Sequence, residues 1–173
     1  MPDCNAILAH LREGNFTRLA PVMTSQNGDV PRIVQRHRDG CFADHPVELA
    51  EALSCAAFLG ASEALEYLLA ASVRSDGGDK TGLNALHWAA NRGELAAVQR
   101  LLRAGASLET RNAFGGTVLG AAVWAAIHEP RPAHVSVIHA LLEAGADVHE
   151  AAFPSGDAAV DAVLAKFGAR GSD

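Results

Sequence analysis

The sequence predicts an all-α solenoid, built from stacked helix-turn-helix units that are joined by hairpin-like loops. The first observation is a motif in residues 82–90 that returns 33 residues later in residues 115–123. Such a fixed interval is typical of repeat architectures. The second observation is that each copy is followed by apolar residues at i, i+3 and i+4, and then by a Gly-Ala pair. Both copies therefore read as the same two-helix unit.

The predicted units follow one another along the whole chain. Ile7, Leu8 and Leu11 have helical spacing before Gly14, which indicates an N-terminal capping helix. A degenerate first repeat follows, interrupted by prolines. We expect these units: 1–45, the capping helix and degenerate repeat; 46–78 and 79–111, full repeats; 112–153, a repeat with an insertion near 128–134; and 154–173, a truncated C-terminal capping repeat and tail.

The second helix of each full unit carries a narrow apolar stripe. In the central unit the stripe consists of Val98, Leu101 and Leu102. The first helix carries paired alanines, such as Ala89 and Ala90, which let neighbouring helices approach closely. One unit cannot bury both of its helices alone. We therefore expect the stability to come from the interfaces between neighbouring units.

The central unit resembles an ankyrin repeat. Residues 84–90 read Asn-Ala-Leu-His-Trp-Ala-Ala, close to the family's Thr-Pro-Leu-His-x-Ala-Ala, and Gly93, the Leu-Leu pair and the Gly-Ala pair stand at the family's offsets. The family's Thr-Pro is replaced in every unit, and its histidine survives only as His87, for which the resemblance implies a structural role. The resemblance therefore implies weaker hydrogen bonding between units than in an idealised array.

Composition narrows the function classes. The formal net charge is -6 with no block of basic residues, so we expect no nucleic-acid partner. The longest strongly apolar stretch, residues 118–127, is too short to cross a bilayer, and the start does not read as a secretory signal. Three cysteines without a C-x-x-C pair favour a reducing compartment over a disulfide framework. We expect a monomeric cytoplasmic protein in which Cys41 and Cys55 are small buried residues.

No familiar catalytic or phosphate-binding motif occurs in the sequence, so we expect no enzyme activity, cofactor or metal. His128, His134 and His139 lie close together, but their spacing does not put two ligands on one helical face. We expect exposed loop histidines there, and a zinc or catalytic site as the alternative. The basic residues of 32–38 favour a solvated helix face over a site for an acidic partner.

The resemblance implies binding through the loops and the exposed side of the first helices. Aromatic and arginine side chains on such a surface are common anchors of protein interfaces. The function predicted is a non-enzymatic protein-protein interaction module, for instance an adaptor with an unidentified protein partner; the alternatives are a metal-binding or catalytic protein and a purely structural subunit. Phe58 or Trp124 could instead fold inward as core. The expected contact residues are Phe58, Leu59, Lys80, Thr81, Asn91, Arg92, Phe114 and Trp124.

Overall fold

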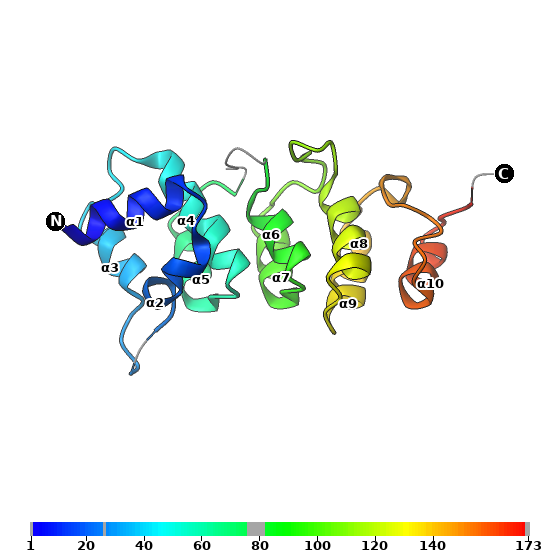
Figure 1. The fold of residues 1–173 in the computed structure, drawn as a ribbon, viewed down its shortest axis with the longest axis horizontal. Coiled ribbons are helices and arrows are strands. Elements are labelled where there is room, and N and C mark those ends of the chain that lie inside the picture. The colour runs from blue at the N-terminus through cyan, green and yellow to red at the C-terminus, as the bar shows by residue number, and fades with distance from the viewer. Residues whose placement is uncertain (1, 26, 76–81, 172–173) are drawn as a thin grey trace.

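The computed structural model describes residues 2–25, 27–75 and 82–171, and within them it contains helices and no strand. The helices form an elongated row with the two termini at opposite ends (Figure 1). This arrangement confirms the predicted all-α solenoid. The elements are α1 Pro2–Arg12, η1 Phe16–Leu19, α2 Ala20–Met23, α3 Arg32–Arg38, α4 Pro46–Phe58, α5 Ser62–Ala70, α6 Ala85–Asn91, α7 Leu95–Arg103, α8 Val118–His128, α9 His134–Glu143, η2 Val148–Glu150 and α10 Ala158–Lys166.

The helices pack in two layers. In one layer α4 packs on α6 and α6 on α8, while in the other α5 packs on α7 and α7 on α9. The predicted stripe residues Val98 and Leu101 are fully buried between the layers, whereas Leu102 is half-buried. Fully buried Ala89 and Ala90 leave room for the neighbouring helices. The boundaries predicted for the units remain predictions, because helix pairing does not fix where one unit stops and the next begins.

Each first helix of the C-terminal half begins at a side-chain cap. The side-chain oxygen of Asn84 accepts a hydrogen bond from the His87 backbone amide, and that of Thr117 accepts one from Gly120. Asp157 caps α10 in the same way. Capping oxygens satisfy amides that have no partner within the helix. Replacement of the family's Thr-Pro pair has therefore not removed the caps.

The insertion of the fourth unit differs from the loop that we expected. It lengthens α8, which ends at His128, and leaves only residues 129–133 as the connection to α9. His134 is 1% exposed, so the expectation of an exposed loop histidine is wrong there. Its Nδ1 accepts a hydrogen bond from the Arg131 amide, and its Nε2 donates to the Asn91 carbonyl oxygen. The imidazole thus ties the insertion to the preceding unit.

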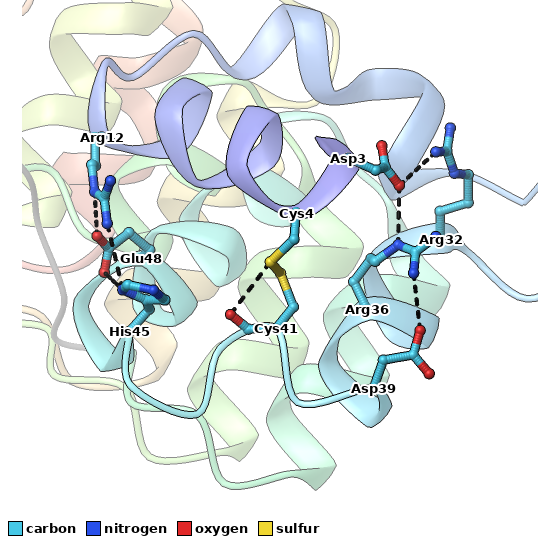
Figure 2. The surroundings of a disulfide bond; sticks show 9 residues. All are labelled: Asp3, Cys4, Arg12, Arg32, Arg36, Asp39, Cys41, His45 and Glu48. Atoms are coloured by element: carbon cyan, nitrogen blue, oxygen red, sulfur yellow. Dashed lines mark hydrogen bonds and ion pairs between the residues drawn. A yellow bond between two sulfur atoms is a disulfide. The ribbon is translucent and has the colours of Figure 1, made fainter. Parts of the chain in front are cut away.

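A disulfide bond joins Cys4 of α1 to Cys41 in the turn after α3 (Figure 2). The expectation that no cysteines pair is wrong, and so is the expectation of a small buried thiol at Cys41. Nothing in the cysteine spacing indicates the pairing, because the bond links positions that only the packing of α1 brings together. Cys55, in contrast, is a fully buried free thiol, as expected.

Ion pairs flank the disulfide on both sides (Figure 2). Asp3 pairs with Arg32 and Arg36, and Arg12 pairs with Glu48. Burial raises the pKa of Asp3, but the hydrogen bonds and charges of both arginines outweigh it, so the pKa lies below the usual value. Asp3 of α1 thus partly neutralises the basic face of α3. This contact within the chain accounts for Arg32 and Arg36, so they need no acidic partner protein.

Within the described residues, no helix is long and apolar enough to span a membrane.

Candidate partner-binding groove

A groove of about 870 Å³ runs along the ends of the first helices, beside the loops that precede α8 and α10. Its lining is mostly apolar and rich in rings, and we call it the aromatic groove. The residues that line it are Phe58, Leu83, Trp88, Asn91, Arg92, Asn112, Phe114, Gly116, Gly120, Ala121, Val123, Trp124, Ala125, Ile127, His128, Glu129, Glu150, Ala152 and Ser155.

Phe114 lies on the tip of a tight turn at one edge of the aromatic groove, and it is 84% exposed. The Asn112 side-chain oxygen accepts hydrogen bonds from the backbone amides of Phe114 and Gly116. Arg111 donates to the Gly115 carbonyl oxygen and forms two hydrogen bonds with the Glu150 carboxylate. These bonds fix the backbone of the turn that presents the exposed Phe114 ring.

Trp124 projects from α8 and is 54% exposed. Its ring stacks on the imidazole of His128, with centroids 4.6 Å apart. The His128 ring in turn donates through Nδ1 to the Trp124 carbonyl oxygen at 2.8 Å. The extra turn that the insertion adds to α8 supplies His128, so the insertion helps to orient this tryptophan.

The N-terminal end of the aromatic groove is a cluster of rings. Phe58 and Trp88 meet edge to face with centroids 5.2 Å apart, and both contact Phe16 from below. The Arg92 guanidinium lies 4.7 Å from the centre of the Phe58 ring, a cation-π distance. Phe58 and Trp88 are half-buried, so the side chains at this end of the aromatic groove are less exposed than Phe114 at the other end.

Gly120 occupies the position at which the preceding unit has His87, and it lines the aromatic groove without a side chain that would fill it. A Cβ at this position would lie 3.0 Å from the Glu150 carbonyl oxygen. A larger residue would therefore push η2 away, together with the Arg111–Glu150 pair that steadies the Phe114 turn. Loss of the motif histidine here has a structural reason, namely the close approach of the next loop.

His87 itself is fully buried and links two units. Its Nδ1 lies 2.9 Å from the Asn84 side-chain oxygen, and its Nε2 lies 3.4 Å from the Gly116 carbonyl oxygen in the next loop. Burial lowers the pKa of His87, although the Gly116 carbonyl opposes this by favouring the charged ring. The side chain is therefore neutral at neutral pH, in agreement with a structural role.

Five of the predicted contact residues line the aromatic groove: Phe58, Asn91, Arg92, Phe114 and Trp124. Leu59 does not line it and packs, half-buried, against the core instead. Lys80 and Thr81 lie outside the described residues. Of the two residues considered as possible core fillers, Trp124 points outward, whereas Phe58 is half-buried.

Sequence reasoning missed several residues of the aromatic groove. Trp88 was not among the expected contact residues, yet it lines the groove. Ile127 and His128 belong to the extra turn of α8, and Glu129 follows directly after it, where we expected a loop. A helical continuation of the apolar run 118–127 was the signal that could have identified them.

The histidines considered as zinc ligands have other partners. His134 bonds to Arg131 and Asn91, as described above. His139 is half-buried on α9 and pairs with Glu143, so the expectation of an exposed loop histidine is wrong there too. Across the described parts of the chain, no group of three or more His, Cys, Asp or Glu side chains is arranged to hold a metal ion. The arrangement lends no support to the zinc alternative.

Comparison with known proteins agrees with the geometry. A family model described as "Ankyrin repeats (3 copies)" matches residues 23–112 and, in an overlapping match, residues 52–152. A comparison with curated proteins finds no match. The family matches together span 23–152, which is well over half of the chain. The chain therefore belongs to the ankyrin repeat family.

Proposed function

We propose that this chain binds a segment of another protein in the aromatic groove. The observation that carries the proposal is the pair of exposed rings: Phe114, on a turn whose backbone is fixed by hydrogen bonds, and Trp124, which is stacked on His128. Exposed apolar surface of this kind costs solubility unless something covers it. A turn and a stacked ring that are already ordered lose little freedom on binding, which favours these two rings as anchors.

The shape and chemistry of the aromatic groove suit a polypeptide segment. Apolar side chains of a partner would lie against Phe114, Val123 and Trp124, while the rim offers Arg92 and Glu129 for polar contacts. Interfaces commonly combine an apolar centre with a polar rim in this way. The residues proposed as contacts are therefore the five groove residues predicted from the sequence, with Trp88 and His128 added; Lys80 and Thr81 stay predictions.

We propose further that the chain does not catalyse a reaction. The Glu150 carboxylate, a titratable group of the aromatic groove, is already bound by Arg111. This leaves it poorly placed to act as a base or a nucleophile. An adaptor role, a monomeric state and the absence of a nucleic-acid partner remain parts of the proposal, the last supported by the formal net charge of -6.

The expectation of a cytoplasmic location rested in part on unpaired cysteines, and the Cys4–Cys41 bond removes that part of the support. Disulfides form and persist mainly in oxidising compartments. We therefore propose that the protein acts in a compartment, or in a cellular state, where this bond can form.

The experiment is crosslinking and capture from the source cell with two matched variants. Phe114→Ala/Trp124→Ala removes the two exposed rings of the aromatic groove. Val30→Ala/Val47→Ala removes two exposed apolar side chains elsewhere, which are 47% and 66% exposed and do not line the groove. We expect wild type and the valine variant to retain the same proteins, and the ring variant to lose at least one. Identical sets from all three would contradict the proposal.

A further inference from the structure

The Cys4–Cys41 disulfide lies at the edge of the core. Both cysteine residues are half-buried, so each keeps part of its surface in contact with solvent. The third cysteine, Cys55, lies in the core, where burial raises the pKa of its thiol. A thiol that stays protonated is a poor nucleophile, so Cys55 does not exchange with the bond. The pair therefore has the accessibility of a reversible redox site, without a competing internal thiol.

The bond controls how firmly α1 is attached. The other attachments of α1 are the ion pairs at its two ends and three buried apolar side chains, Ile7, Leu8 and Leu11. The ion pairs are partly buried, with Glu48 the most buried partner, and a helix of this length is marginal on its own in water. Terminal units of a repeat array have a neighbour on one side only. Cleavage of the bond would thus lower the cost of local opening at this end of the chain.

A chain of ring contacts connects this end to the aromatic groove. The segment after α1 turns at Gly14 and forms η1, whose first residue is Phe16. The Phe16 ring meets Phe58 at 5.7 Å and Trp88 at 5.8 Å between centroids, edge to face in both cases. Phe16 is 3% exposed and supports both groove residues from the core side. Movement of η1 would therefore remove the support beneath the N-terminal end of the groove.

We propose that Cys4 and Cys41 form a redox site whose substrate is a dithiol, and that its reduction loosens the Phe58–Trp88 end of the aromatic groove. One thiolate of the dithiol attacks one sulfur of the bond and forms a mixed disulfide, and its second thiol then displaces the protein sulfur. The protein gains two thiols, the dithiol becomes a disulfide, and two electrons and two protons are transferred. The regulatory meaning of this switch rests on the proposed function of the groove.

The test uses the full chain with Trp124→Phe, which leaves Trp88 as the only tryptophan. Oxidised protein and protein reduced with dithiothreitol are compared by hydrogen exchange and by acrylamide quenching of Trp88 fluorescence. We expect reduction to speed exchange in α1 and η1 by roughly tenfold or more, with exchange in α9 and α10 unchanged. We expect the quenching constant of Trp88 to rise by roughly twofold, because its Phe16 support loosens.

Two further variants in the same background separate the thiols. Cys4→Ser/Cys41→Ser should show the reduced behaviour without reductant, and Cys55→Ala should respond to dithiothreitol as the parent does. In the denatured oxidised protein one thiol should titrate, and after reduction three.

Four results would overturn the proposal. Titration of three thiols before reduction would show that the bond is not there. Equal exchange of α1 in both states would show that the bond does not hold the helix. Faster exchange of α1 with unchanged Trp88 quenching, or faster exchange along the whole chain, would remove the specific link to the aromatic groove. No partner takes part in this experiment, so its outcome is independent of the capture experiment.

Discussion

The replacement of Leu101 by alanine tests the stacked packing in quantitative terms. Leu101 lies on α7 and is 0% exposed, between the two helix layers. Alanine lacks three of its carbon atoms, which at about 0.8 kcal/mol each gives about 2.4 kcal/mol of lost transfer free energy. The cavity left between neighbouring helices adds to this, so we expect a total loss of about 3 to 5 kcal/mol in the free energy of unfolding.

The adjacent leucine provides the control. Leu102 has the same side chain on the same helix but is half-buried, so Leu102→Ala should cost less than about 1.5 kcal/mol. Both variants are unfolded in urea and followed by far-ultraviolet circular dichroism, with the wild-type slope as reference. A loss below about 1 kcal/mol for Leu101→Ala, or equal losses for the two variants, would refute the packing described here.

Three more predictions follow from named contacts. Loss of the bond in Cys4→Ser/Cys41→Ser should lower the free energy of unfolding by about 4 kcal/mol, from the chain entropy of a loop with a sequence separation of 37, and thermal melts with and without reductant check this. In the folded state the pKa of His87 lies below its ordinary value of 6.5, so the unfolded state takes up the proton first. The free energy of unfolding should therefore fall as the pH drops below about 6.5, by up to about 1.4 kcal/mol per pH unit. His87→Gln should flatten this pH dependence in urea titrations, and an unchanged slope would argue against a buried neutral ring. Trp124→Ala should lower the free energy of unfolding by about 0.5 kcal/mol or less, because Trp124 is a surface anchor, and Phe58→Ala by about 2 to 3 kcal/mol, because Phe58 is a supporting ring. A larger loss for Trp124→Ala than for Phe58→Ala in thermal unfolding would contradict these two roles.

Much of the fold could be predicted because its causes are local. The 33-residue interval, the stripe that includes Leu101 and the paired alanines each reflect a helix or a turn whose residues are close in sequence. Phe58, Asn91 and Trp124, three of the expected contact residues, recur at this interval, and all three line the aromatic groove. Residues at the same position of successive repeats lie side by side in the stack, so these groove residues could be predicted from the sequence.

The features that were missed depend on contacts between distant parts of the chain. Cys4 and Cys41 meet because α1 folds back over the turn after α3, and Cys4 lies outside the repeat pattern. His134 is buried because the insertion folds against Asn91 of the preceding unit. We expected a loop there, whereas a longer α8 and a buried imidazole give it a defined structure. The disulfide and the buried His134 thus arise where the chain departs from the repeat, so the repeat pattern could not predict them.

The most direct test of the account is hydrogen exchange of the chain alone and with a captured partner. The account predicts slower exchange on binding in the segments that line the aromatic groove, which are residues 83–92, 112–129 and 150–155. Exchange in α5, α7 and α9, on the other layer of the stack, should stay the same. Protection confined to α5, α7 and α9, with the groove segments unchanged, would contradict the central claim that this protein binds its partner through the aromatic groove.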